Sequence, residues 1–287
     1  MTTINDVFTS FKENLIKLYE LNEVEALTLL SVSEITGLSK AYIKAFPEKE
    51  ITIEQSEIFN STLTRLQTGE PIQYIFGHTE FYGLPFKVNS SVLIPRPETE
   101  ELVEWVLNTI GSSRIIINNV LDIGTGSGCI AVTLKKHLPI AKVSAIDISA
   151  EALQIAQQNA ELNKVQVNFL HADILDIHKS DIEIRKSEII ISNPPYVTLH
   201  DKTLMHTNVT DFEPHTALFV PEDDPLIFYN AIADFAIDNL SANGFLFLEI
   251  NENSGKQTVE LLANKGFNNI ELRRDMSGRD RMISAVN

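Results

Sequence analysis

The stretch VLDIGTGSGCIA, residues 120–131, ends an apolar, strand-like run with three alternate glycines. Gly124, Gly126 and Gly128 permit a tight turn from strand to helix, in which backbone N–H groups can approach a ligand without obstruction by Cβ atoms. The spacing is G-x-G-x-G, shorter than the G-x-G-x-x-G of dinucleotide-binding folds, and Cys129 stands where the last glycine would be. The pattern therefore predicts a ligand-binding loop and argues against a nicotinamide site. We expect Cys129 to be a small, buried helix residue and not a nucleophile.

Strand-like and helical segments alternate around this loop. Short apolar runs typical of strands occupy residues 115–124, 142–147, 167–173, 188–193 and 244–250. Apolar residues at helical spacing lie between most of these runs, at residues 128–138, 150–162 and 225–240. The alternation predicts βαβ units, and hence an α/β, Rossmann-like fold with a mostly parallel sheet covered on both faces. The last segment, residues 268–286, predicts a hairpin around Ser277-Gly278 at one end of the sheet.

The chain before residue 74 predicts a small helical domain, residues 1–73. Apolar residues recur there at helical spacing, at Ile4, Val7, Phe8, Phe11, Leu15 and Leu18 and again at Ile58, Leu63 and Leu66. Gly37 and Pro47 interrupt the pattern, so several short helices are expected to pack against one another. No catalytic spacing occurs in this part, and we expect it to dock the substrate.

Two further regions follow the helical domain. Residues 74–96 are rich in aromatic and β-branched side chains around Gly83-Leu84-Pro85, which predicts a β-hairpin linker with its turn at these three residues. Residues 97–287 are expected to form the remaining, larger domain. Its first helix is expected to begin at Pro97 and Glu98, which suit a first helical turn. Apolar side chains of this helix expected to face inward are Leu102, Val103 and Val106.

Composition and charge restrict the function. The 287 residues carry a formal net charge of −16 and no dense block of Lys or Arg, so a protein that follows a nucleic-acid backbone is disfavoured. One cysteine excludes an intramolecular disulfide framework, and no run approaches the roughly 20 apolar residues that span a bilayer. The seven histidines lack metal-ligand spacing. We therefore expect a soluble, cytoplasmic protein without a metal, a nucleic-acid partner or a membrane.

Acidic residues end the two strands that follow the glycine loop. Asp147 ends the segment 142–147, where it can accept hydrogen bonds from both hydroxyls of a ribose. Ser149 is the better placed cap for the following helix, which favours the ribose role for Asp147. Asp173 could accept from the exocyclic amine of an adenine, with Ile174 against the ring. Formation of a turn explains Asp173 equally well, and both interpretations remain open.

The tetrapeptide Asn193-Pro194-Pro195-Tyr196 ends the segment 188–193. The prolines cannot donate backbone hydrogen bonds and fix φ near −65°, so the carbonyls around them are held rigidly. Asn193 adds a side-chain carbonyl, and Tyr196 adds a flat aromatic face. Two acceptors and a ring suit a planar –NH2 group, so we interpret this strand end as a cradle for a substrate nitrogen.

A strand followed by G-x-G-x-G, a ribose acid, an adenine-side acid and NPPY resembles the class I methyltransferases that use S-adenosylmethionine to methylate planar amino groups. DNA adenine methyltransferases and protein glutamine methyltransferases share NPPY. The segments GEPIQYIFGHTEFYG, VLIPRPETEELVEWVL, DFEPHTALF and FLFLEI are similar to the HemK/PrmC family, the N5-glutamine methyltransferases of class I peptide chain release factors. The similarity runs from about residue 69 to the end of the chain.

This resemblance implies a function and a set of site residues. The enzyme would methylate the glutamine of the Gly-Gly-Gln motif in a release factor. Cofactor-binding residues would be Gly124, Thr125, Gly126, Ser127, Gly128, Asp147, Asp173, Ile174 and Asn193. Substrate-binding and catalytic residues would be Asn193, Pro194, Pro195 and Tyr196. Arg96, Glu98 and Thr99 are further candidates near the methionine end of the cofactor.

Two other functions have to be weighed. A DNA adenine methyltransferase shares the NPPY cradle, but it needs a basic groove, which a net charge of −16 disfavours. A non-catalytic adapter that binds the nucleoside would have no use for a cradle shaped to a substrate amide, which disfavours this function as well.

Overall fold

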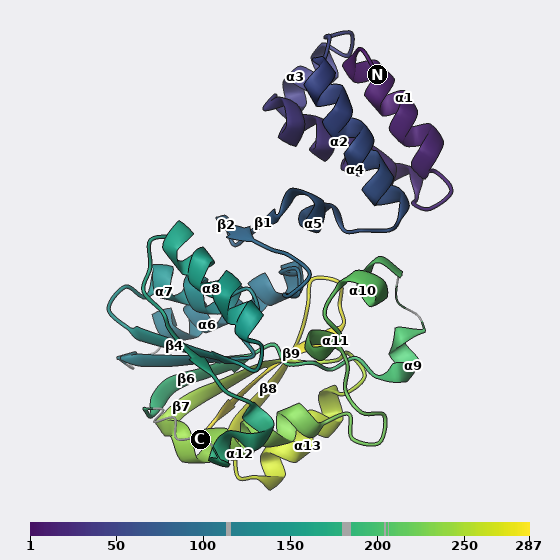
Figure 1. Ribbon diagram of the computed structural model, residues 1–287. Coiled ribbons are helices and arrows are strands. Elements are labelled where there is room, and N and C mark those ends of the chain that lie inside the picture. Colours follow the sequence, from purple (N-terminus) through teal and green to yellow (C-terminus); the bar gives the residue numbers. More distant parts are fainter. Residues whose placement is uncertain (113–115, 180–184, 204, 206) are drawn as a thin grey trace. The chain divides into compact units, whose positions relative to one another are not determined.

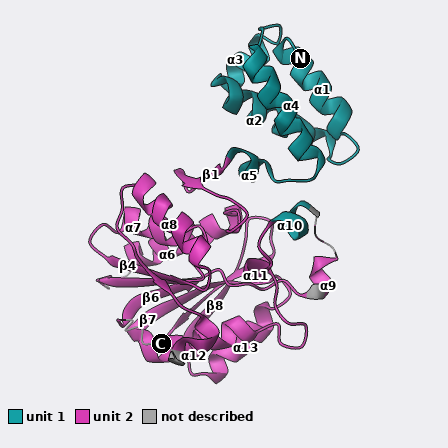
Figure 2. Ribbon diagram, in the orientation of Figure 1, with its two compact units in different colours: residues 1–76, 207–212 teal, residues 77–206, 213–287 magenta. Residues whose placement is uncertain are grey.

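The computed structural model describes residues 1–112, 116–179, 185–203, 205 and 207–287 (Figure 1). Two compact units are present (Figure 2). The first contains Met1–Phe76 together with Thr207–Phe212, and the second contains Gly77–His206 and Glu213–Asn287. Sequence patterning gave no indication that residues 207–212 associate with the N-terminal helices. The three domains with boundaries at residues 73 and 96 stay a prediction.

The first unit is helical. Its helices are α1 (Ile4–Leu15), α2 (Leu21–Thr36), α3 (Lys40–Ala45), α4 (Ile53–Gln67), α5 (Ile72–Phe76) and α10 (Thr207–Phe212). Its core includes Ile4, Val7, Phe11, Leu15, Phe59, Leu63 and Leu66. The prediction was wrong for Leu18, which is 54% exposed because α1 ends before it, and for Ile58, which is 49% exposed. Phe59, one position further along α4, is buried in its place.

The predicted hairpin consists of β1 (His78–Phe81) and β2 (Leu84–Lys87), which pair antiparallel. Its two-residue turn is Tyr82-Gly83, with φ of 51° and 71°. Two consecutive positive φ angles match the twist of a type I′ hairpin turn. The expected turn at residues 83–85 was therefore placed too late, since Leu84 and Pro85 already belong to β2.

The second unit contains a sheet that, within the described residues, has seven strands in the order β5-β4-β3-β6-β7-β9-β8. The strands are β3 (Asn119–Ile123), β4 (Lys142–Asp147), β5 (Asn168–His171), β6 (Ser187–Ser192), β7 (Leu240–Glu249), β8 (Asn268–Arg274) and β9 (Asp280–Val286). Strands β3 to β7 are parallel to one another, and β9 is antiparallel to both β7 and β8. The five predicted strands of the mostly parallel sheet and the terminal hairpin at one edge are confirmed.

Helices cover both faces of this sheet (Figure 1). The helices and short turns of this unit are α6 (Pro97–Ser112), α7 (Cys129–His137), α8 (Ala150–Leu162), the 3-10 helix η1 (Ile174–Lys179), α9 (Leu199–Lys202), α11 (His215–Leu218), α12 (Ile227–Asn239) and α13 (Gly255–Asn264). Helices α6, α7 and α8 lie on one face, and α12 and α13 lie on the other. The predicted start of α6 at Pro97 and its inward side chains at Leu102, Val103 and Val106 are confirmed.

Alternation along the strands divides the core between the two faces. Ile189 and Ile191 of β6 pack with α6 and α7, whereas Ile190 between them packs with α12. Phe247 and Leu248 of β7 divide in the same way. Continuous apolar runs in the sequence thus serve two cores, because successive side chains of a strand point to opposite faces.

The chain order of the strands fixes the place of the site. From β3 the chain moves outward through β4 and β5, and then returns to the other side of β3 with β6. The loops after β3 and β6 therefore leave the sheet in different directions, and a crevice opens between them at the carboxyl ends of the strands. Among the described residues, no helix has the length and apolarity needed to cross a membrane.

Candidate active site

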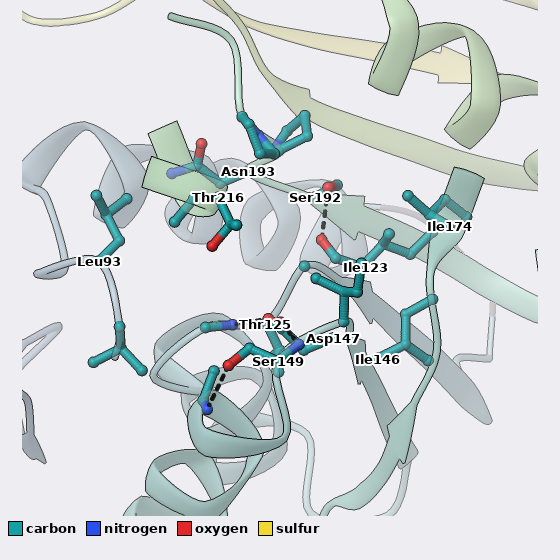
Figure 3. A pocket seen from close by; sticks show the side chains of 18 of the residues that line it. Leu93, Ile123, Thr125, Ile146, Asp147, Ser149, Ile174, Ser192, Asn193 and Thr216 are labelled. Atoms are coloured by element: carbon teal, nitrogen blue, oxygen red, sulfur yellow. Dashed lines mark hydrogen bonds between the residues drawn. The ribbon is translucent and has the colours of Figure 1, made fainter. Parts of the chain in front are cut away.

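A cavity of about 330 Å³ lies at the carboxyl ends of β3, β4, β5 and β6 (Figure 3). This volume is within the range of small-molecule sites. Sequence-predicted residues that line the cavity are Gly124, Thr125, Gly126, Ser127, Asp147, Asp173, Ile174, Asn193, Pro194 and Pro195. Asp147 and Ser149 lie on one wall and Asn193 and Thr216 on the other, as seen in Figure 3. The fold thus brings together residues as far apart in the sequence as Gly124 and Thr216.

The glycine loop has the backbone that its sequence suggests. Gly124 and Gly126 have φ of 71° and 55°, which L side chains rarely adopt, and a Cβ on either residue would enter open space. The backbone N–H groups of Gly124 and Thr125 donate to the carbonyl of Ile146 at 2.9 and 3.0 Å. The loop is therefore tied to the end of β4, with its glycine faces open for a ligand.

Gly128 has a different role from the two glycines before it. A Cβ on Gly128 would lie 3.0 Å from the Cβ of Ala156 in α8, and φ at Gly128 is 80°. In the described chain, Gly128 does not line the cavity. Its requirement for glycine follows from helix packing and backbone conformation, and its predicted contact with a cofactor stays a prediction.

Asp147 connects the glycine loop to the start of α8. Its Oδ2 accepts from the backbone N–H of Gly126 at 2.7 Å, and its Oδ1 accepts from that of Ser149 at 2.9 Å. Each carboxylate oxygen has a second lone pair that could accept a further hydrogen bond. Burial raises the pKa of Asp147, and the two backbone hydrogen bonds oppose this shift. The predicted cap at Ser149 is confirmed, since its side chain accepts from Ala152 N.

Asp122 of β3 holds the glycine loop through Thr125. The sequence analysis did not identify it. It is fully buried in β3, and its Oδ2 accepts from the hydroxyl of Thr125 at 2.6 Å. Burial is the main cause that raises the pKa of Asp122 to about 7. A charged residue inside the apolar run VLDIG was the available indication, because an acid is rarely buried without a partner.

The position of Asp173 is compatible with both roles that the sequence left open, formation of a turn and contact with a ligand. Its Oδ1 accepts from the backbone N–H of Leu175 at 2.8 Å, which forms a turn. Asp173 also lines the cavity, beside the buried Ile174. The turn places the carboxylate at the cavity, so the two interpretations do not exclude each other.

Asn193, the first residue after β6, belongs to a buried hydrogen-bonded chain. Its Nδ2 donates to Thr99 Oγ1 at 3.0 Å, and the Thr99 hydroxyl donates to Glu249 Oε2 at 2.7 Å. Thr99 comes from α6 and Glu249 from the last position of β7, where it is 1% exposed. Sequence analysis missed Glu249, although an acid that ends the apolar run FLFLE was a usable indication.

The hydroxyl of Tyr196 forms a hydrogen bond within the protein. The hydroxyl donates to the other oxygen of Glu249, Oε1, at 3.0 Å, and the ring packs against the core on the α12 face. Burial raises the pKa of Tyr196 well above its ordinary value, so the phenol stays protonated as a donor. Within the described chain Tyr196 does not line the cavity, and its contact with substrate stays a prediction.

An ion pair connects the segment before α6 to the segment after α10. Arg96 forms an ion pair with Glu213, whose side chain is 1% exposed, and Glu213 Oε2 accepts from the backbone N–H of Ile94 at 3.2 Å. Arg96 and Thr99 line the cavity, as do Pro214 and Thr216. Glu98, the third candidate of this stretch, is not among the described lining residues.

Cys129 is the first residue of α7 and is 9% exposed at the cavity wall. Burial raises the pKa of its thiol to about 12. Because the thiolate is the nucleophile, such a thiol is unreactive near neutral pH. The prediction of a small buried helix residue is confirmed.

The sheet order, the glycine loop and the switch-point cavity define a class I methyltransferase of the type that uses S-adenosylmethionine. A family model described as methyltransferase small domain matches residues 102–211. A solved methyltransferase from Pyrococcus furiosus shares the fold, with a TM-score of 0.51 and 16% identity over 79% of this chain and 98% of that one. A Thermus thermophilus 16S rRNA methyltransferase, solved with AdoMet and guanosine, has a TM-score of 0.52 and 18% identity over 73% of this chain and 49% of that one.

Sequence relatives narrow this class. A release factor glutamine methyltransferase from Flavobacterium psychrophilum is 44% identical over 98% of both chains. Its namesake from Bacteroides thetaiotaomicron is 41% identical over 98% of this chain and 99% of the relative. A family model described as PrmC N-terminal domain matches residues 9–77. The chain belongs to the release factor glutamine methyltransferase family.

Proposed function

We propose that this protein transfers a methyl group from S-adenosylmethionine to the side-chain amide nitrogen of glutamine in the Gly-Gly-Gln motif of a class I peptide chain release factor. Its near full-length similarity to enzymes of that name supports the substrate. The observation that carries the chemistry is the Asn193 amide, whose NH2 group is engaged by Thr99. The names of the relatives do not support a DNA adenine methyltransferase.

The cavity suits the cofactor. The positive φ angles of Gly124 and Gly126 leave open backbone at the point where an adenosyl group with a methionine tail would pass. Asp147 would hold the ribose hydroxyls, and the Asp173–Ile174 edge would contact the adenine. When bound, the cofactor supplies an electrophilic methyl group on a positively charged sulfur.

The chain's own residues would bind and orient the substrate amide. An amide nitrogen is a poor nucleophile, because its lone pair is delocalised into the carbonyl. If the two N–H groups donate to Asn193 Oδ1 and to the Pro194 carbonyl, the face of the nitrogen points at the methyl group. Correct orientation of two reactants contributes much of the rate in such a reaction. Pro195 lacks an N–H group and so offers no donor that competes for these acceptors.

The positive charge that develops on the substrate nitrogen explains why hydrogen-bond acceptors are sufficient for catalysis. Positive charge accumulates on the nitrogen as the new N–C bond forms, and the Asn193 and Pro194 oxygens stabilise it more strongly in the transition state than in the ground state. The methylated amide then loses one proton to water, because a protonated amide is strongly acidic. No residue of the chain has to act as a strong base before the attack.

The proposed partner is a protein that acts on ribosomes, so we propose a cytoplasmic location, without direct binding of nucleic acid or membrane. The helical unit is our candidate for docking the release factor, because one glutamine in a cavity offers too little surface to select a partner.

Methyl transfer from labelled S-adenosylmethionine tests the proposal. Three substrates are compared: an intact class I release factor, the same factor with its Gly-Gly-Gln glutamine changed to alanine, and adenine-rich duplex DNA. Label on the intact factor alone is expected. Label on both release factors would place the methyl group on another side chain, and label on the DNA would overturn the protein substrate.

A further inference from the structure

The chain of hydrogen bonds from Asn193 through Thr99 to Glu249 spans three elements of the second unit. It begins directly after β6, passes through α6 and ends at the last residue of β7. Glu249 also accepts from Tyr196, so each of its carboxylate oxygens has a hydroxyl donor. A methyl transfer needs an acceptor at Asn193, but it does not in itself require a buried carboxylate 56 positions further along the chain.

The number of hydrogens available in this series of hydrogen bonds determines which end of the Asn193 amide faces the cavity. The oxygen and the NH2 group of an asparagine are nearly equal in shape, so a half-turn of the amide exchanges them. An ionised carboxylate only accepts, and a threonine hydroxyl has one hydrogen. The Thr99 hydrogen goes to Glu249, so Thr99 must accept from Asn193. The NH2 group of Asn193 is thereby directed to Thr99 and its oxygen to the cavity.

We propose that Glu249 and Thr99 are positioning residues, which hold the Asn193 amide with its carbonyl oxygen toward the substrate glutamine. This inference deepens the proposed function and rests on it. A half-turn of Asn193 would present two donors to the substrate NH2 group, which is itself a donor, and the two groups would repel each other. The orientation of the Asn193 side-chain amide therefore decides whether the site can bind the substrate glutamine productively.

The same hydrogen-bonded chain strengthens Asn193 as an acceptor. Hydrogen bonds in a row polarise one another, and this row ends at Glu249, which is 1% exposed and carries a negative charge when it is ionised. Electron density at Asn193 Oδ1 rises as its NH2 group donates toward that charge. Positive charge that develops on the substrate nitrogen is then stabilised through Asn193, although Glu249 does not touch the substrate.

Ionisation of Glu249 is the condition for this arrangement. A protonated Glu249 could donate to Thr99, and the Thr99 hydroxyl could then donate to the Asn193 oxygen and reverse the amide. Thr99 and Tyr196 donate hydrogen bonds to Glu249, and the other groups that interact with it electrostatically are Tyr229, Arg281, Glu98 and Cys129. Burial raises the pKa of Glu249, whereas the two hydroxyl donors and the positive charge of Arg281 oppose the shift. Turnover is therefore expected to fall on the acid side, at a pH above the ordinary carboxyl range.

Substitutions at Thr99 separate positioning from folding. Thr99→Val removes the hydroxyl and keeps the shape, whereas Thr99→Ser keeps the hydroxyl. Thr133→Val is the matched control, because Thr133 is fully buried in α7 and its hydroxyl has no hydrogen-bond partner in the part of the chain that is described. Each variant is assayed for kcat, for KM of both substrates, for kcat as a function of pH and for thermal unfolding.

We expect Thr99→Val to lower kcat about 10- to 100-fold, by analogy with the effect of removing the hydrogen-bond partner of a metal ligand. The KM for S-adenosylmethionine should change less than kcat, although Thr99 lines the cavity. Thr99→Ser should retain most of kcat and the same acid limb, and Thr133→Val should match the wild type. Equal kcat for Thr99→Val and Thr133→Val would overturn the inference, as would a loss in Thr99→Val that follows only its loss of thermal stability.

A second measurement does not depend on activity. In the ligand-free protein, the side-chain NH2 resonances of Asn193 report its hydrogen bond to Thr99. One of the two protons should be shifted and protected in the wild type and in Thr99→Ser, and should lose both properties in Thr99→Val. Unchanged resonances in Thr99→Val would contradict the positioning role. Absence of methylation by the wild type, with these resonances as expected, would refute the proposed function and leave the amide orientation standing.

Discussion

The carboxylate of Asp147 and the backbone N–H of Gly126 are joined by a hydrogen bond of 2.7 Å. This bond links the ends of β3 and β4, since Gly126 follows the first strand and Asp147 closes the second. The acid proposed to hold the ribose is thus also the acid that fixes the glycine loop. A ligand at this position would meet a carboxylate whose direction is already set by the protein, which lowers the cost of ordering the site on binding.

Asp147→Asn is expected to weaken binding of S-adenosylmethionine by about 10- to 100-fold, or roughly 1–3 kcal/mol, because the amide loses the charge and one acceptor. Isothermal titration calorimetry measures the affinity. Asp238→Asn is the control, since Asp238 is exposed on α12, away from the cavity lining. Similar affinities for the two variants would refute the role of Asp147.

Gly128→Ala is expected to lower the free energy of unfolding by about 1–3 kcal/mol, because a non-glycine residue at φ of 80° is strained and its Cβ would press against Ala156. Urea unfolding measures this change. Gly111→Ala, near the end of α6 with open space at the Cβ position, should be neutral or stabilise by up to about 1 kcal/mol. Equal effects at the two positions would show that the close approach of α7 and α8 is not what requires Gly128.

The pH dependence of stability should contain a contribution from Asp122. Its pKa of about 7 in the folded protein lies above its ordinary value of 3.8, so between these values the folded state binds a proton that the unfolded state has released. The free energy of unfolding therefore falls as the pH rises from about 4 to about 7, by at most about 4 kcal/mol from this group. Asp122→Asn, which cannot ionise, should reduce that fall.

Unfolding in urea at pH 5 and pH 8 checks this prediction, with the wild type and Asp122→Asn measured in parallel. Other buried acids, Asp147 and Glu249, have raised pKa values and contribute with the same sign in both proteins. The difference between the two proteins reports Asp122 together with its electrostatic coupling to Asp147. Parallel pH dependences would mean that Asp122 does not take up a proton on folding.

Asn193→Ala should lower kcat by about 10²- to 10³-fold, the size of effect seen when one donor or acceptor of a developing charge is removed. Folding should remain intact, because Asn193 is only partly buried and lies beyond the end of β6. Circular dichroism and cofactor titration establish the intact fold, and Asn230→Ala on the exposed side of α12 is the control. Turnover close to that of the wild type would rule out the proposed mechanism.

Local sequence patterns were sufficient for the parallel sheet and for the approximate place of the site. The apolar runs that became β3 to β6 end in glycine or polar residues, and parallel strands bring such ends to one edge of a sheet. Glycine at positive φ, proline without an N–H group and the serine cap of α8 act within a few residues of the chain. Such effects can be predicted without knowledge of the tertiary contacts.

Tertiary structure decided which of these residues cooperate. Glu249 receives the Thr99 hydroxyl from 150 positions earlier in the chain, and Gly128 faces Ala156 from a neighbouring helix. The association of residues 207–212 with the helical unit is another such result. A hydrogen bond or a close contact depends on distances of a few ångströms between elements that are remote in sequence. Those distances are set by packing of the whole core, and no local pattern of residues encodes them.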